Sequence, residues 1–326
     1  MIKSKSEYLD YVEERFLDCF FSKKYIYSKP VKITSKIDST VDFVGSKISP
    51  LKHYIVDNNI PNNGIFTIQN CMKLRALKYL LDTTDQTFGS CYKGMGTLTN
   101  YDLDKIVNDT FDYLLEKKYL GLNSNDICVR VNSEDYDLVN SIAYLKKDIK
   151  VEYNTEPMQC YKHVYGMDDE HITGRNFNIA IRKKGTSQFF DCAAIIVMET
   201  PEKKIGIDMG IGNTSLAMCY FNENNTVSSS RIADIIDIDS NAKMRLADSI
   251  TAVSTLLYDD VQNSESKHFR KKFRHYIRIL DYWKEYFGLS DYQIINHIKD
   301  YLYLEYNDKL NYENDEIKKV LSLKKK

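Results

Sequence analysis

The hydrophobic residues of the chain follow two kinds of spacing, one in each part of the sequence. Up to about residue 221, short apolar runs typical of strands are mixed with helical stretches, whereas the segments after residue 240 have helical spacing. Apolar residues three or four positions apart mark one face of a helix, and a short continuous apolar run marks a buried strand. The pattern predicts an α+β fold, in which a mixed α/β part is followed by an all-helical part.

Individual elements can be placed from the same pattern. Strands are expected at 31–48, 64–71, 126–131, 177–184, 189–200 and the start of 203–221. Helices are expected at 6–21, 102–119, 133–147, 241–260, 264–287, 290–305 and 314–325. Ser6 is a candidate N-cap, and Gly121 is placed to end a helix. The glycines of FGSCYKGMGTLT (88–99) predict a hairpin with its turn around Gly94 and Gly96. The polar stretch 222–240 contains a linker, which predicts two domains, 1–225 and 226–326.

Composition excludes several classes of protein. The 45 Lys and Arg nearly cancel the 46 Asp and Glu, so a nucleic-acid surface has to be a local patch. The seven cysteines form no CxxC pair and none lies near a His at zinc-ligand spacing, so no metal site is expected. Scattered cysteines, a polar N-terminus and no apolar run of about eighteen residues predict a cytoplasmic protein without a membrane span.

Two segments carry candidate chemistry. In GIDMGIGNTSLAM a strand ends in alternating glycines, so backbone at Gly210 and Gly212 can come close to a ligand or to a neighbouring strand, and Asp208 can orient an amine or a hydroxyl. KHFRKKFRHYIR (267–278) contains no acid and predicts a helix with a basic face suited to RNA phosphates, or alternatively a plain solvated face. The RNA-binding candidates are Lys267, Arg270, Lys271, Arg274 and Arg278.

Six segments match known motifs in order. DMGIGNTSLA (208–217) is similar to D-x-G-x-G-x-E-R-L-A, FFDCAAIIVMET (189–200) to F-x-E-x-W-N-x-V-F-M-Q, and IQNCMK (68–73) to S-Q-K-C-x-R. Looser matches are TVDFVGSKISPLKHYI (40–55), TTDQTFGSCYKGMGT (83–97) and the segment 245–280. These motifs belong to the alanyl-tRNA synthetases, and the chain resembles that family over roughly residues 9–280.

The resemblance implies a fold and a site. It implies a class II synthetase-like antiparallel sheet flanked by helices in 1–225, with an aminoacyl-adenylate pocket on one face. It also implies a basic, tRNA-recognition-like helical domain in 226–326. The substrate-binding residues would be Asp208, Gly210, Gly212, Lys73 and Asp191. The partners would be an amino acid and the acceptor end of tRNA, and the cofactors would be ATP and Mg²⁺ where adenylation is retained, and otherwise none.

The chain departs from the family at the residues that grip ATP. The two arginines of the motifs fall on Thr84 and Ser215, and the asparagine that meets the amino-acid amine falls on Ala194. Each lost charge-assisted bond is worth about 1.5–3 kcal/mol, so ATP would bind roughly two to four decades more weakly. The cations that can substitute are Lys73, Arg75, Lys93 and Arg175.

Three functions remain open from the sequence. The chain can be a synthetase-like enzyme of tRNA-linked amino-acid chemistry, or an inactive pseudo-synthetase that binds tRNA or a protein. The third is an aminoacyl transferase that uses charged tRNA without ATP. A metal site in the loop HVYGMDDEHITG (163–174) is a minor alternative.

Overall fold

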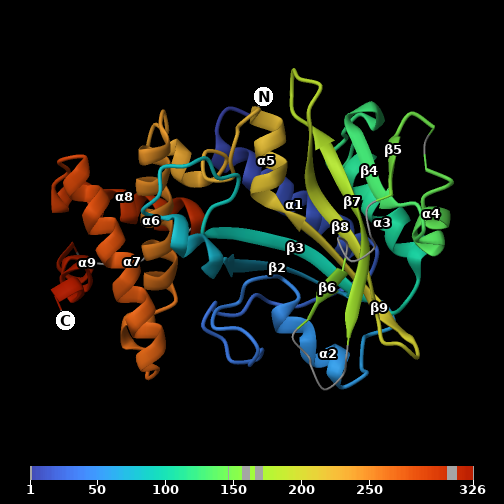
Figure 1. The fold of residues 1–326 in the computed structure, drawn as a ribbon, viewed down its shortest axis with the longest axis horizontal. Helices are drawn as coiled ribbons and strands as arrows, with labels where there is room; N and C mark the ends of the chain where they lie inside the picture. Colours follow the sequence, from blue (N-terminus) through green and yellow to red (C-terminus); the bar gives the residue numbers. More distant parts are fainter. Residues whose placement is uncertain (1, 146, 156–161, 166–171, 307–313, 326) are drawn as a thin grey trace.

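The structure is a computed structural model that describes residues 2–145, 147–155, 162–165, 172–306 and 314–325. Its centre is a sheet with the strand order β1-β2-β3-β9-β8-β7-β4-β5, with β6 paired to β7 (Figure 1). The described pairings are antiparallel apart from β1 with β2 and β4 with β5. The strands are β1 (Ile26–Tyr27), β2 (Ile65–Met72), β3 (Cys91–Thr99), β4 (Ile127–Asn132), β5 (Lys150–Asn154), β6 (Lys162–Val164), β7 (Thr173–Arg182), β8 (Phe189–Glu199) and β9 (Lys204–Gly212).

Alternation along the strands gives the sheet two different faces. In β9, Ile207, Met209 and Ile211 lie in the main hydrophobic core, so Asp208 and Gly210 point to the opposite face. The core face is covered by α1 (Lys5–Ser22), α3 (Leu103–Leu115) and α5 (Asn213–Phe221). Among the described residues, the opposite face carries a small apolar cluster under α2 (Lys52–Val56), and these residues leave the rest of that face open for a site.

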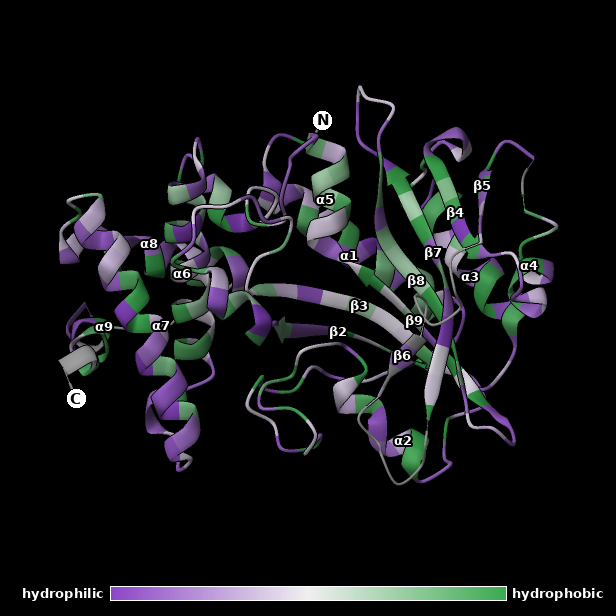
Figure 2. Ribbon diagram, viewed as in Figure 1, coloured by the Kyte–Doolittle hydropathy of each residue, from purple (hydrophilic) through white to green (hydrophobic). Residues whose placement is uncertain are grey.

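The C-terminal part is helical, as the spacing predicted. It consists of η6 (Arg231–Asp234), α6 (Asn241–Tyr258), α7 (Lys267–Tyr286), α8 (Asp291–Tyr306), α9 (Asn314–Leu321) and η8 (Ser322–Lys325), with η7 (Val261–Asn263) between α6 and α7. Its hydrophobic core also takes in Ile33, Phe43, Met72 and Leu80 from the first part of the chain. In Figure 2 the central strand β8 is largely hydrophobic, whereas the start of α7 is hydrophilic. The α+β class and the antiparallel sheet flanked by helices are confirmed, and the domain boundary near residue 225 stays a prediction.

Several local predictions were wrong. Residues 88–99 do not form a hairpin, because β3 runs unbroken through Gly94 and Gly96 between β2 and β9. The segment 31–48 contains no strand and consists of turns that lead into η1 (Ser49–Leu51). The first helix is capped by Ser4 and not by Ser6: the Ser4 side chain accepts a hydrogen bond from the backbone N–H of Glu7. The spacing of Ser4 and Glu7 is that of a capping box, a signal present in the sequence.

Two helices are shorter than their patterns indicated. α3 ends at Leu115, although Gly121 has the positive φ (60°) expected beyond a helix end. α4 covers only Tyr136–Ser141 of the predicted 133–147. Within the described residues, no helix combines the length and the apolar character that a bilayer crossing requires.

Candidate ligand pocket on the open face of the sheet

A pocket of about 330 Å³ lies on the open face of the sheet, and we call it the sheet-face pocket. Three separated motif segments bring the five predicted substrate-binding residues to its wall: Lys73, Asp191, Asp208, Gly210 and Gly212. Ala194 and Ser215, which stand at altered family positions, line it too. Its volume is within the range of small-molecule sites, roughly 300–1,000 Å³. The structure therefore brings the predicted residues together, while their role in binding stays a proposal.

Asp208 is buried and its two carboxylate oxygens are both engaged. One oxygen pairs with the ammonium of Lys47, and the other accepts a hydrogen bond from the Tyr165 hydroxyl at 3.1 Å. Lys47 Nζ also donates to the carbonyl oxygen of Thr97 at 2.7 Å. Burial lowers the pKa of Lys47 and Asp208 opposes this, while burial beside Asp208 raises the pKa of Tyr165 well above its usual value.

Neither Lys47 nor Tyr165 was predicted from the sequence. Lys47 lies in the quoted segment 40–55, but nothing in the sequence pairs it with a residue 161 positions away. Tyr165 is one of 25 tyrosines, with no pattern to distinguish it. Only the strand register that lifts Asp208 to the open face reveals the pair.

The glycines of this face make room for the Lys47 side chain. A Cβ atom added at Gly96 would lie 2.5 Å from Cε of Lys47, and one at Gly94 would lie 3.2 Å from its Cβ. A Cβ atom at Gly210 would lie 3.4 Å from the same Cε. The close approach predicted at Gly210 is made by Lys47 of the same chain, whereas at Gly212 the nearest side chain is that of Ser215.

Lys73 is the pocket cation that remains available. Among the described cations that line the pocket, it alone has no carboxylate within ion-pair distance. Its ammonium lies 4.4 Å from the centre of the Tyr92 ring, and burial, followed by the charge of Arg75, lowers its pKa. A bound anion would relieve this unfavourable state.

Asp191 closes one side of the pocket and is held by polar partners. Arg130 donates to one oxygen at 2.7 Å, and the Asn178 side-chain amide donates to the other at 3.0 Å. The residue is exposed, so its charge is screened by solvent.

Two of the candidate substitute cations are committed elsewhere. Lys93 pairs with Glu13 and Glu305 at 3.0 and 2.9 Å on the core side of the sheet. Arg175 pairs with Asp135, Asp137 and Glu199. Arg75 is exposed and stacks on Phe88 at 4.6 Å.

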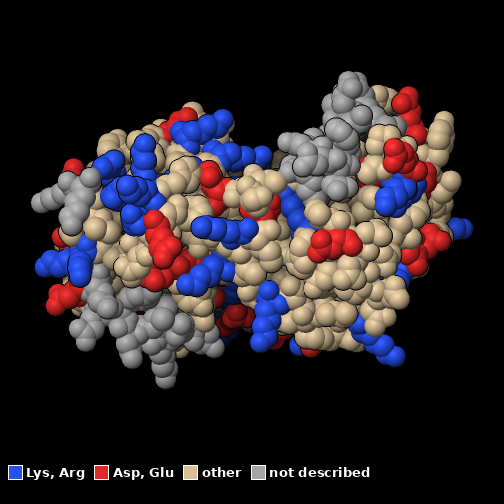
Figure 3. Space-filling view, turned by 90° about the horizontal axis from the view of Figure 1, so that it is seen from below, with Lys and Arg blue, Asp and Glu red and all other residues tan. Residues whose placement is uncertain are grey.

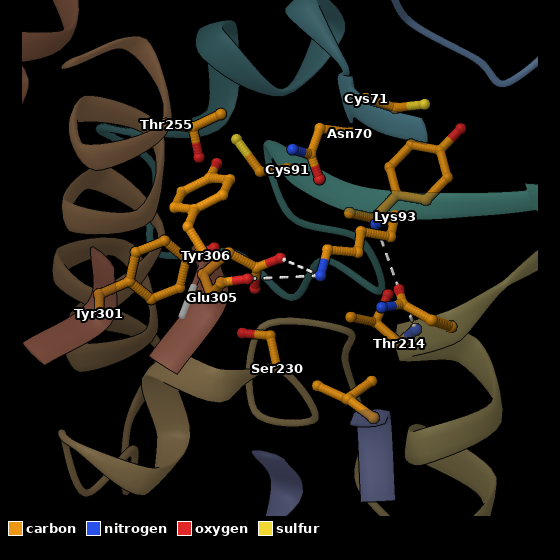
Figure 4. Close-up of a pocket in the computed structure, with 13 residues that line it drawn as sticks. Asn70, Cys71, Cys91, Lys93, Thr214, Ser230, Thr255, Tyr301, Glu305 and Tyr306 are labelled. Carbon is orange, nitrogen blue, oxygen red and sulfur yellow. Dashed lines mark hydrogen bonds and ion pairs between the residues drawn. The ribbon is translucent and has the colours of Figure 1, made fainter. Parts of the chain in front are cut away.

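A second cavity lies between the sheet and the helical part and is too small for a ligand. It has about 20 Å³, the room of a single water molecule. Figure 4 shows Lys93 reaching from β3 toward Glu305 of α8 in its wall. Arg231, 1 % exposed, adds contacts to Asp10, Glu13 and Glu305 at 2.8–3.3 Å. We call these four residues together with Lys93 the Arg231 network, and it joins α1, β3, η6 and α8.

The basic helix has the predicted two-sided form. Its apolar face is buried: Phe269, Phe273, Tyr276, Ile277, Ile279, Leu280 and Trp283. Lys267, Lys271 and Arg278 are exposed, Arg274 is half-buried, and half-buried Arg270 donates to the carbonyl oxygen of Ser264. Figure 3 shows Lys and Arg interleaved with Asp and Glu on one face of the molecule, without a continuous positive area in that view. RNA binding by this helix stays a prediction.

No metal-ligand cluster of three or more His, Cys, Asp or Glu occurs among the described residues. Half of the alternative loop site at 163–174 lies outside them, since residues 166–171 are not described.

Neither a protein-family model nor a curated protein sequence matches the chain. Solved structures with a similar fold include apo histidyl-tRNA synthetase from S. aureus, at 10 % identity and a TM-score of 0.41, covering 71 % of this chain and 67 % of that one. A putative aspartyl-tRNA synthetase from Leishmania major Friedlin has 9 % identity and a TM-score of 0.40, covering 69 % and 64 %. Aspartyl-tRNA synthetase from Entamoeba histolytica has 9 % identity and a TM-score of 0.38, covering 69 % and 58 %.

The chain thus spans less than two thirds of each of the two aspartyl enzymes. The likeness is one of overall architecture and does not single out an alanyl enzyme.

Proposed function

We propose that this chain is a synthetase-like protein of tRNA-linked amino-acid chemistry that binds an acyl ligand in the sheet-face pocket and tRNA along α7, without activating the acid with ATP. One observation carries the proposal. Residues predicted from three separate synthetase-type motifs converge on a single pocket of ligand size.

The described pocket residues do not fit Mg²⁺-ATP. A triphosphate carries several negative charges and needs cationic partners. Of the two lysines in the wall, Lys47 already neutralises Asp208, which leaves Lys73. Ser215 provides no charge, and Thr84 is exposed, with its carbonyl oxygen accepting a hydrogen bond from Arg245 at 2.9 Å.

The two pocket carboxylates are equally unsuited to hold Mg²⁺. Asp208 pairs with Lys47 and Asp191 pairs with Arg130. A hard divalent cation needs carboxylate oxygens that are not already neutralised. This favours the two ATP-free functions, the transferase and the inactive tRNA binder, over a ligase.

Pyrophosphate exchange with each natural amino acid tests the claim about ATP. We expect no exchange above background for the wild-type protein. Exchange clearly above background with any amino acid, lost in Asp208→Asn, would overturn it.

A second experiment separates the two ATP-free functions. The protein is incubated, without ATP, with tRNA carrying radiolabelled amino acids whose α-amino group is either free or acetylated. Loss of label faster than spontaneous hydrolysis, reduced in Lys73→Met, supports a transferase. Stable label with tRNA retained in a mobility-shift assay supports an inactive binder, and absence of both effects refutes the proposed function.

A further inference from the structure

The Lys47 side chain lies in the sheet-face pocket where a ligand ammonium would be expected. It enters from the turn before η1 and is 6 % exposed. Its stem runs over Gly94, Gly96 and Gly210; a Cβ atom would crowd the stem at Gly96 and Gly94, and would touch it at Gly210. A sheet face cleared of three side chains beneath one lysine is a built slot for an alkylammonium group.

At the far end of this slot the polar groups have their partners within the chain. Lys47 Nζ meets Asp208 and the Thr97 carbonyl, and the remaining Asp208 oxygen accepts from Tyr165. Asp208 is 4 % exposed, so water does not reach it freely. A ligand ammonium would have to take Lys47's place, leaving a buried cation without a partner.

The positive charge elsewhere in the pocket wall favours a ligand with an acid group. Lys73 is the lining cation without a carboxylate partner in the described structure. Tyr92 positions it by stacking beneath its ammonium and donating its own hydroxyl to the Gly45 carbonyl at 3.1 Å. A carboxylate or ester oxygen next to Lys73 gains a charge-assisted contact.

We propose that Lys47 is the resident ammonium of the Asp208 subsite, so that the pocket rejects α-ammonium compounds and accepts acyl groups without one. Such ligands are 2-hydroxy acids, or amino acids whose nitrogen is acylated. The ligand class rests on the proposed function, since that function takes the pocket as an acyl site. The occupancy of the subsite by Lys47 does not depend on the proposed function.

Chemical rescue tests whether Lys47 occupies the Asp208 subsite. Lys47→Ala empties the slot and leaves Asp208 unpaired. Propylammonium chloride should raise the melting temperature of this variant in a saturable manner, but not that of the wild type. Propanol and sodium chloride at matched concentrations, and the double variant Lys47→Ala/Asp208→Asn with propylammonium, are the controls and should show no such rise. If Lys47→Ala does not fold, Lys47→Met keeps the length of the stem and lacks only the ammonium, and ammonium chloride replaces propylammonium chloride.

Titration calorimetry with matched pairs of acids tests whether the pocket rejects α-ammonium compounds. Lactate with alanine, and phenyllactate with phenylalanine, differ only in hydroxyl against ammonium. We expect wild type to bind a hydroxy acid at least tenfold tighter than its amino counterpart, and Lys47→Ala to reverse that order. Equal binding of both members of a pair by the wild type, or equal stabilisation of wild type and variant by propylammonium, overturns the inference. Rescue of the variant when neither acid binds the wild type supports the resident ammonium and counts against the acyl ligand of the proposed function.

Discussion

Lys47 and Asp208, 161 residues apart in the chain, form an ion pair on the open face of the sheet, with side chains only 7 % and 5 % exposed. Their attraction is strong because solvent screening is weak there, but each charge also lost its hydration on folding. Removal of either partner would therefore leave a buried charge unpaired and destabilise the fold. It also fixes the turn before η1 against β9.

The first prediction concerns the coupling of this pair. Lys47→Met and Asp208→Asn should each destabilise the fold by about 3 kcal/mol, because each leaves one buried group unpaired. The double variant should lose less than the sum, by at least ~1 kcal/mol. Urea unfolding of the four proteins measures this, and additive losses would show that the two residues do not interact.

The second prediction concerns the glycine slot. Gly96→Ala places a Cβ atom 2.2 Å from the Met209 carbonyl oxygen and 2.5 Å from Lys47 Cε, so backbone and lysine must both shift. We expect a loss of about 2–4 kcal/mol in the free energy of unfolding. Gly45→Ala is the matched control, since its nearest neighbour would be the Met72 carbonyl oxygen at an ordinary 3.6 Å. Equal stability of the two variants would contradict the claim that Gly96 makes room for the Lys47 side chain.

The third prediction concerns pH. Burial raises the pKa of Asp248 to about 6 from 3.8, although Ser90 donates to it through its backbone N–H at 2.7 Å and its hydroxyl at 3.0 Å. Between pH 4 and 6 the folded state then binds a proton that the unfolded state has released. This carboxyl therefore makes stability fall as pH rises through that window, by up to about 3 kcal/mol.

Asp248→Asn removes this pH-dependent contribution to stability, while the Asn side chain can still accept the hydrogen bond from the Ser90 backbone N–H. We expect the variant to gain stability relative to wild type as pH rises from 4 to 7, with little difference at pH 4. Thermal unfolding at fixed pH values measures the difference. Asp259→Asn should show a similar trend, because burial also raises its pKa to about 6. A pH-independent difference for Asp248→Asn would contradict the assignment.

The fourth prediction concerns the Arg231 network. Arg231→Met leaves Glu13 and Glu305 with one cation, Lys93, in a buried site, so we expect a loss of about 3–5 kcal/mol. Arg15→Ala removes a more exposed pair with Asp18 and should cost less than about 1 kcal/mol. Denaturant unfolding compares the two variants, and similar losses would show that the network does not stabilise the junction.

The fifth prediction concerns α7. Replacing Arg270, Arg274 and Arg278 with alanine should weaken tRNA binding and lower the slope of log affinity against log salt by about 2–3, because phosphate contacts release counterions. Lys24, Lys117 and Lys118, which are exposed near the N-terminal helix and the end of α3, give a control with the same change in charge. Equal effects of the two triple variants would mean that only net charge matters.

The sequence by itself determined the elements whose signal is local. Helical spacing placed α6, α7 and α8 within a few residues, because burial of one face imposes a period on each helix. Alternation placed β7, and a continuous apolar run placed β8. The motif residues Asp208, Gly210, Gly212, Lys73 and Asp191 could be chosen as candidates for the same reason: their spacing is recorded along the chain. Gly94 and Gly96 show the limit of this reasoning, since these glycines predicted a turn and the structure has an unbroken strand.

Only the tertiary structure decided what those residues meet. The register of β3, β9 and β8 puts Gly96, Gly210 and Ala194 on one face, and the turn before η1 brings Lys47 across them. Such partners are distant in sequence, so no periodic pattern encodes them. Asp208 was predicted to hold an amine, and the packing of the chain supplies that amine from Lys47, because a buried carboxylate is stable only with a partner.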